Sequence, residues 1–195
     1  MCNNSSVARK YELKRRAETQ AETRRRIVEA AIQLHRTKGP ARTTFSDIAR
    51  LAGVQRHTLY RHFPDERELG LACSGLYMEE NPPPSAAAWR SIDDPAARLS
   101  RGLSELYSFY GTAEDMLTCL LRDAPIHPLT RELFELRAGP SLAEVRSVLA
   151  EPLRGRRALA ALDLALDFHS WRRLTDSGLS RSEAVETMVA AVLGQ

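Results

Sequence analysis

Apolar residues recur three and four positions apart along most of the chain, and no segment alternates polar and apolar residues as a half-buried strand does. Ile27, Ala31 and Leu34 share one face of a first helix, which the Gly39-Pro40 pair should end. Glycines, prolines and capping residues separate the periodic segments that follow. The pattern predicts an all-α protein with nine or ten helices.

The first third of the chain predicts three helices in close succession. Thr44 and Asp47 have the spacing of a capping box, which begins a second helix that ends at Gly53. A third helix carries Leu59 and Phe63 four positions apart, so both side chains should face inward. The tight turn between the second and third helices predicts a helix-turn-helix.

The remaining two thirds should also be helical. A fourth helix should end near Glu80, because three consecutive prolines follow soon after it. Asp94-Pro95 is typical of a helix start, and the apolar stripe after it comprises Leu99, Leu103, Leu106 and Tyr110. Capping boxes predict further helix starts after Thr112, Ser141 and Ser180. Glycines predict helix ends at Gly111, Gly139, Gly155 and Gly178.

Length and composition limit the class of protein. The 195 residues are 43% hydrophobic, which suits one domain, or a small module joined to a larger one, with a substantial core. No run of about 18 apolar residues occurs, so we expect no membrane helix. The first residues do not resemble a secretory signal, and Cys2, Cys73 and Cys119 are too scattered for a disulfide framework. We therefore expect a cytoplasmic protein in which a lone cysteine such as Cys73 or Cys119 is inert packing.

Positive charge is concentrated at the N-terminal end. Residues 1–63 contain 14 Arg and Lys against 5 Asp and Glu, whereas the other residues contain 14 against 20. This asymmetry favours a polyanionic partner for the first third of the chain. A charge-rich, solvated helix surface is the alternative.

The third helix should present His57 and Arg61 on the side opposite Leu59 and Phe63, with side chains suited to duplex DNA around them. Arg56 can donate to guanine, Thr58 can contact a base or a phosphate, and Tyr60 and His62 can bond phosphates, with His57 beside them. Thr44 and Ser46 lie at the start of the second helix, where free amides favour phosphate oxygens. No phosphate-binding glycine loop, Cys-x-x-Cys pair or His-x-x-x-His pair occurs, so we expect no catalytic centre, metal site or cofactor.

Residues 24–72 closely resemble the DNA-binding domain of the TetR family of bacterial transcriptional regulators. The matching segment reads RRRIVEAAIQLHRTKGPARTTFSDIARLAGVQRHTLYRHFPDERELGLA. The resemblance implies an all-α homodimer whose third helix enters the major groove, and a larger C-terminal domain for dimerisation and ligand binding. The positions that resemble the family's DNA-contacting residues are Thr44, Ser46, Arg56, His57, Thr58, Tyr60 and His62.

Two positions depart from the family's pattern. Gln55 stands where a small capping residue is usual, so the third helix begins less firmly or Gln55 itself reads DNA. Glu66 stands where a phosphate-binding lysine is often found, and its carboxylate would repel the DNA backbone unless Arg67 replaces that contact.

These observations predict a three-part organisation. Residues 1–22 form a basic extension, residues 23–70 the helix-turn-helix domain, and residues 71–195 the ligand-binding and dimerisation domain. We expect a repressor that a small-molecule effector releases from a palindromic operator. Activation, ligand-independent repression, an architectural DNA-binding dimer and an enzyme carrying a helix-turn-helix are the alternatives.

The C-terminal part and the extension carry more specific expectations. The apolar stripes of the last helices predict packing across a homodimer, or else only within the chain. Candidate lining residues for an apolar or aromatic ligand are Tyr107, Tyr110, Met116 and Phe134. The basic extension is expected to be partly helical and to contact phosphates or the minor groove, the alternative being a disordered head.

Overall fold

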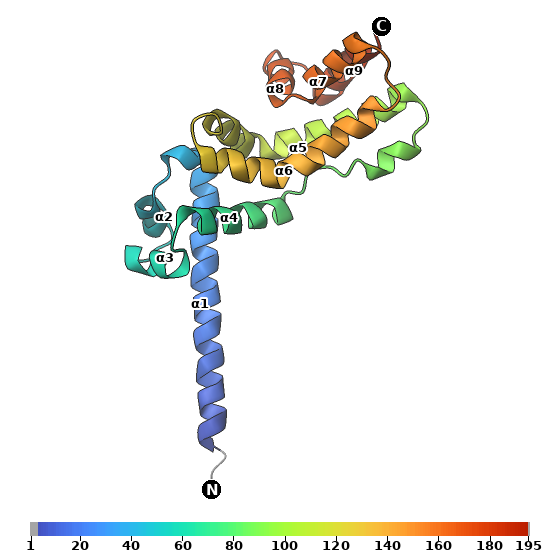
Figure 1. Ribbon diagram of the computed structural model, residues 1–195. Coiled ribbons are helices and arrows are strands. Elements are labelled where there is room, and N and C mark those ends of the chain that lie inside the picture. Colours follow the sequence, from blue (N-terminus) through green and yellow to red (C-terminus); the bar gives the residue numbers. More distant parts are fainter. Residues whose placement is uncertain (1–3, 195) are drawn as a thin grey trace.

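The computed structural model describes residues 4–194, and over this range all of its regular secondary structure is helical. Its α-helices are α1 (Asn4–Thr37), α2 (Phe45–Leu51), α3 (Arg56–His62), α4 (Glu66–Glu80), α5 (Pro95–Asp123), α6 (Pro128–Ala150), α7 (Arg156–Leu166), α8 (Phe168–Asp176) and α9 (Arg181–Leu193). Two short 3₁₀ helices, η1 (Pro40–Arg42) and η2 (Ala87–Ser91), lie between them. The prediction of an all-α protein is confirmed (Figure 1).

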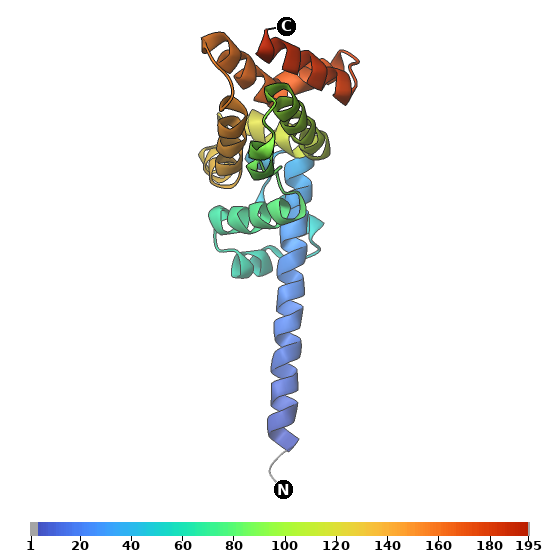
Figure 2. The same ribbon diagram turned by 90° about the vertical axis from the view of Figure 1, so that its right-hand side faces the viewer.

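Helix α1 is much longer than the apolar stripe that predicted it. It spans 34 residues, which is about 50 Å at the usual rise per residue. Both views show a long stem whose N-terminal half projects beyond α2 and α3 (Figures 1 and 2). Because the helix continues through residues 4–22, the structure favours a helical extension over a disordered head. Cys2 lies outside the described residues.

The N-terminal helices have their own core. Ile27 and Ala31 of α1, Ile48 of α2, and Leu59 and Phe63 at α3 pack together and are almost completely buried. Leu59 and Phe63 therefore face inward, as their spacing predicted. This core fixes the orientation of α3, a helix too short to be stable alone.

The predicted capping box that begins α2 is present. The Thr44 hydroxyl accepts from the Asp47 amide at 3.1 Å, and the Asp47 carboxylate accepts from the Thr44 amide at 3.3 Å. Lys38 also donates to this carboxylate, at 2.6 Å. Hydrogen bonds from Lys38 and then from Thr44 lower the pKa of Asp47 to about 2.

The second core lies around the long helix α5. Leu99, Leu103 and Leu106 are fully buried, and Tyr110 is 4% exposed, which confirms the predicted stripe. Side chains from α6, α7, α8 and α9 complete this core. The predicted helix start is also confirmed, because the Asp94 carboxylate accepts from the Ala97 amide at 2.8 Å.

Two predicted helix ends are wrong. Gly111 lies inside α5 and Gly139 inside α6, so neither helix stops where its glycine and the capping box after it suggested. The Thr112 hydroxyl donates to the Ser108 carbonyl within α5 instead of capping a new helix, and Ser141 lies within α6. Continuous packing of these helices outweighs the helix-weakening effect of glycine, which is about 1 kcal/mol.

The predicted start of the last helix is confirmed. Ser180 and Glu183 form a capping box at the beginning of α9. Gly155 and Gly178 lie between helices and have φ values of +88° and +94°. Over residues 4–194, no helix is long and apolar enough to cross a membrane.

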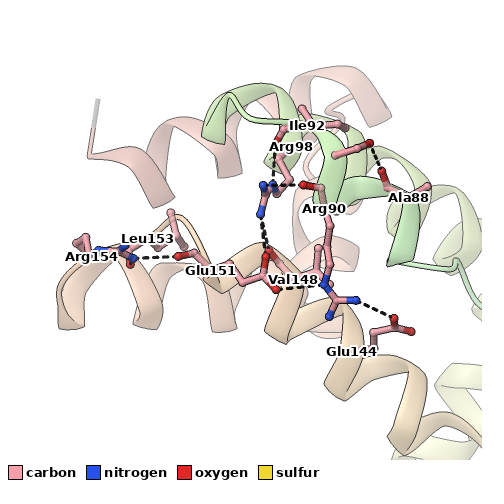
Figure 3. A network of polar contacts seen from close by, with 10 residues as sticks. Ala88, Arg90, Ile92, Arg98, Glu144, Val148, Glu151, Leu153 and Arg154 are labelled. Atoms are coloured by element: carbon pink, nitrogen blue, oxygen red, sulfur yellow. Dashed lines mark hydrogen bonds and ion pairs between the residues drawn. The ribbon is translucent and has the colours of Figure 1, made fainter.

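A buried arginine fastens the segment after the proline run to α6. Arg98 is 8% exposed and donates to the Ile92 carbonyl at 2.8 Å, the Arg90 carbonyl at 3.1 Å and the Glu151 carboxylate at 3.1 Å. Arg90 forms a further ion pair with Glu151 at 3.2 Å (Figure 3). The network compensates the burial of the Arg98 charge and holds η2 against α6.

The two cores are joined at the end of α5. Asp123 is 1% exposed and accepts from the Ala41 amide of η1 at 3.0 Å and from Arg122 Nε at 2.7 Å. Burial opposes ionisation, but the hydrogen bonds from Arg122 and Ala41 outweigh it and lower the pKa of Asp123. Arg122 also donates to the Lys38 carbonyl at 2.9 Å. A charged and hydrogen-bonded contact therefore links the C-terminal core to the helix-turn-helix.

Candidate nucleic-acid interface and ligand cavity

Helix α3 presents three distinct faces. Leu59 lies in the core, and His57 and Arg61 on the opposite side are exposed. Because residues four apart share a face, Arg56 and Tyr60 form one flank, and Thr58 and His62 the other. The predicted DNA-contacting residues of this helix are thus gathered on its two flanks and its outer face.

The flank toward α2 is held in place by aromatic and hydrogen-bond contacts. Arg56 Nη2 donates to Tyr60 Oη at 3.2 Å, and the Arg56 guanidinium carbon lies 5.5 Å from the centre of the Tyr60 ring. The Tyr60 ring in turn packs against Phe45 of α2, with centroids 5.1 Å apart. These contacts orient Arg56 at the first turn of α3, a restraint that the sequence did not indicate.

The flank toward α1 lines a groove. Thr58 and His62 are half-buried, and with Arg61 they form one wall of a groove of about 420 Å³. Burial, followed by the charges of Arg61 and Arg24, lowers the pKa of His62. His62 therefore presents a neutral ring near pH 7, which can donate or accept one hydrogen bond.

The opposite wall of this groove comes from the helical extension and was not predicted residue by residue. Its lining residues are Glu12, Arg15, Arg16, Thr19, Gln20 and Thr23. Their recurrence at intervals of three and four residues is the sequence signal for this shared helix face. Arg24 of α1, just after the extension, packs against the end of α3, because its guanidinium lies 4.4 Å from the centre of the Phe63 ring.

The other predicted DNA-contacting residues are all exposed, but they differ in whether their polar groups already have partners within the protein. Gln55 precedes α3 without a side-chain capping bond, and its side chain is exposed. Ser46 is exposed in the first turn of α2. Thr44 is exposed as well, but both its hydroxyl and its amide already bond to Asp47. The Asp47 carboxylate therefore already accepts from both donors of Thr44, which argues against a phosphate contact at this residue.

The two positions at the start of α4 face the C-terminal helices. The Glu66 carboxylate lies 3.4 Å from His127 Nε2. Arg67 pairs with Glu132 of α6 at 2.7 Å. Arg67 is thus engaged within the protein, which argues against its replacing the phosphate contact that Glu66 cannot make.

A cavity of about 460 Å³ lies between the two cores, a size typical of ligand sites. Three of the four predicted lining residues, Tyr110, Met116 and Phe134, do line it. Tyr107 does not: it is 1% exposed, and its hydroxyl donates to the Ala165 carbonyl at 2.9 Å. Tyr107 is therefore a core residue, whereas Tyr110, whose hydroxyl donates to the Leu166 carbonyl, also reaches the cavity wall.

The cavity extends farther toward the N-terminal domain than the sequence suggested. Phe45 and Ile48 of α2, His35 of α1 and Cys73 of α4 line that end. Burial first, and then the charge of His127, lowers the pKa of His35 to about 4, so the ring is neutral near pH 7. Burial raises the pKa of the Cys73 thiol to about 12, so a thiolate is not available there.

Comparison with known proteins agrees with the geometry of the N-terminal domain. Residues 27–73 match the family model described as bacterial regulatory proteins of the tetR family. A segment of 57 residues is 47% identical to the HTH-type transcriptional regulator TtgR of Pseudomonas putida. That segment covers 29% of this chain and 27% of TtgR, so the match spans only about a quarter of the relative's length.

Solved structures share the fold over nearly the whole chain. The hemolysin II transcriptional regulator HlyIIR matches with a TM-score of 0.64 and 16% identity, over 88% of this chain and 97% of the other. A TetR-like transcriptional regulator from Rhodococcus sp. RHA1 matches with a TM-score of 0.60 and 17% identity, over 88% and 93% of the two chains. The N-terminal sequence thus matches the tetR family over residues 27–73, and the chain shares the all-helical fold of these solved structures over 88% of its length.

Proposed function

We propose that this protein is a sequence-specific DNA-binding transcriptional regulator that acts as a homodimer and responds to a small molecule. One observation carries the proposal. Leu59 of α3 and Phe63 just after it are buried, while α3 presents His57 and Arg61 on its outer face and Arg56 on the adjoining flank, within residues 27–73 that match the tetR family model.

The chemistry of α3 suits the major groove. Arg56 would donate to guanine O6 and N7, the most frequent specific contact of arginine with DNA. Tyr60 and the neutral His62 would bond phosphates and fix the register of the helix on the duplex. The excess of basic residues over residues 1–63 would add attraction to the phosphate backbone that does not depend on sequence.

A palindromic operator requires two copies of α3 about one DNA turn, roughly 34 Å, apart. The C-terminal helices offer a surface for dimerisation. Leu164 of α7 is 60% exposed, and Met188 and Val189 of α9 are only half-buried in the single chain. Much of the predicted stripe packs within the chain, since Leu162 and Ala184 are fully buried. Light scattering over a range of concentrations distinguishes a dimer from a chain that uses these helices only for its own core.

The regulatory step would pass through the domain junction. Helix α4 follows α3 after a short connection, and its other end lines the cavity through Tyr77 and Met78. A ligand that binds better to one position of α4 than to another would change the separation of the two α3 helices and release the operator. The size of this effect is limited by the difference in ligand affinity between the two arrangements.

The test is a selection of bound sites from random duplex DNA with the full-length chain. The expected result is an inverted repeat with half-sites one turn apart. Arg36→Ala serves as a control for Arg56→Ala, because Arg36 is an exposed arginine of α1 paired with Asp115 of α5 at 3.6 Å. Arg56→Ala should lose the base preference at one position of each half-site, and Arg36→Ala should keep the full repeat. Equal binding to all duplexes would instead support an architectural DNA-binding protein.

A further inference from the structure

The cavity wall is mostly apolar, and its charged residues fall into two kinds. Arg146 and Asp163 both line the cavity and form a two-point ion pair, with distances of 2.6 and 3.2 Å. Glu66 lies beside His127 at 3.4 Å, and the Asp167 carboxylate accepts from the Ser170 amide at 2.7 Å. Each of these groups has a polar partner within the protein. Arg137 of α6 also lines the cavity, but it differs because its partners are both neutral.

Arg137 is half-buried and bonds only to neutral oxygens. Its Nε donates to Ser74 Oγ at 3.2 Å, and its Nη2 donates to the Leu71 carbonyl at 3.0 Å. In the described part of the chain, no carboxylate lies within 4.0 Å of its guanidinium. A guanidinium has five N–H donors, so several remain available, and a half-buried cation without an anion is unfavourable.

We propose that the cavity binds an apolar molecule that ends in a carboxylate, and that Arg137 is the residue that receives this carboxylate. The planar fork of arginine matches a carboxylate with two parallel hydrogen bonds, which are stronger because both partners are charged. The apolar body of the ligand would lie against Tyr110, Met116 and Phe134. This inference rests on the ligand-binding part of the proposed function.

The position of Arg137 connects the carboxylate to the regulatory helix. Ser74 and Leu71, its present partners, both belong to α4. Gly75 of α4 also lies close, since a β-carbon at that position would be 3.4 Å from Arg137 Nη2. A carboxylate that draws the guanidinium away from these partners removes bonds between α4 and α6. The head group of the ligand would therefore act on the helix that follows α3.

The test compares matched ligands that differ only in the head group. Isothermal titration of the full-length protein, without DNA, measures binding of decanoate against decan-1-ol, and of 2-naphthoate against 2-naphthol. The two pairs distinguish an aliphatic from an aromatic carboxylate. At least one carboxylate should bind about 10- to 100-fold more tightly than its alcohol, as expected for hydrogen bonds to a charged group.

Two variants and one control assign the preference to Arg137. Arg137→Gln should abolish the preference for the carboxylate and leave the affinity for the alcohol unchanged. Arg137→Lys should retain part of the preference for the carboxylate, because the positive charge remains but the planar guanidinium with its paired N–H donors is absent. Arg131→Gln, at an exposed arginine of the same helix, should change neither affinity.

Equal affinity of the unmodified protein for both carboxylates and their alcohols would overturn the proposal, even if a variant fails to fold. A preference that persists in Arg137→Gln would overturn the role of that residue. The titration contains no DNA, so its failure leaves the operator selection unaffected. Conversely, a protein that selects no operator can still show the carboxylate preference, so the two proposals fail separately.

Discussion

Phe45 packs its ring against that of Tyr60, with centroids 5.1 Å apart, and Phe45 also lines the cavity. Tyr60 in turn holds Arg56 through a hydrogen bond of 3.2 Å. Phe45 and Tyr60 therefore connect the cavity to the residue that we expect to read guanine. This route, a chain of contacts from the cavity through Phe45 of α2 to Tyr60 and Arg56, is separate from the proposed movement of α4.

Replacing Phe45 with leucine should weaken operator binding by about 2- to 10-fold, because an aromatic pair contributes about 0.5–1.5 kcal/mol beyond its buried area. Without that pair, Tyr60 and Arg56 lose part of their support. Fluorescence anisotropy with the selected operator measures the change. Phe134→Leu is the matched control, since Phe134 lines the cavity but belongs to α6. Equal operator affinities for the two variants would contradict this route.

Arg56→Ala should cost about 1–3 kcal/mol at one base pair of each half-site, because a two-point contact with guanine discriminates by that amount. Tyr60→Phe keeps the ring on Phe45 but removes the oxygen that accepts from Arg56 and that we expect to bond a phosphate, so a smaller loss of about 0.5–1.5 kcal/mol is expected. Binding to a set of singly substituted operators measures both. If Arg56→Ala weakened binding equally for all operator sequences, the Arg56 side chain would contact only phosphate.

The helical extension should contribute to the salt dependence of DNA binding. Arg15 and Arg16 both line the groove beside α3. Lys14 and Arg16 pair with glutamates of the same helix, whereas Arg15 has no acidic partner among the described residues. Deleting residues 1–20 should flatten the slope of log K against log salt, by about 0.9 for each phosphate that the extension binds.

A pair of single substitutions refines that experiment. Arg15→Gln should reproduce a slope change of about 0.9, the value for one bound phosphate, and Lys14→Gln, at a paired residue, should change the slope less. Titrations at several salt concentrations measure each slope. An unchanged slope after the deletion would mean that the extension does not touch the duplex.

Gly39→Ala should destabilise the junction between the two cores by about 1–3 kcal/mol. Gly39 has a φ of +93°, and a β-carbon there would overlap Arg122 Nη2 and the Asp123 carboxylate. Gly139→Ala is the matched control: Gly139 lies inside α6 with no neighbour within 4 Å of the added carbon. That change should stabilise the protein by roughly 0.5–1 kcal/mol.

Urea unfolding of both variants measures these differences. The prediction fails if Gly39→Ala unfolds at the same urea concentration as the unmodified protein. A larger destabilisation by Gly139→Ala than by Gly39→Ala would also contradict it.

Features governed by neighbours in the sequence were predictable. Thr44 and Asp47 lie three positions apart, so their capping box follows from helix geometry. Leu59 and Phe63 are four apart, and their burial follows from the same geometry. These local rules located α2 and α3 and identified which face of α3 is free to meet DNA.

Tertiary packing decided what local rules could not. Tyr107 and Tyr110 lie three positions apart on α5 and both donate to backbone carbonyls of α7, yet only Tyr110 lines the cavity. Gly111 remains helical because α5 packs continuously around it. Spacing within a helix determines which residues share a face. The surroundings of that face depend on residues of other helices, which for Tyr107 and Arg137 lie more than fifty positions away. This is why the shape of the cavity, the contact of Tyr60 with Phe45 and the neutral partners of Arg137 emerged only from the folded chain.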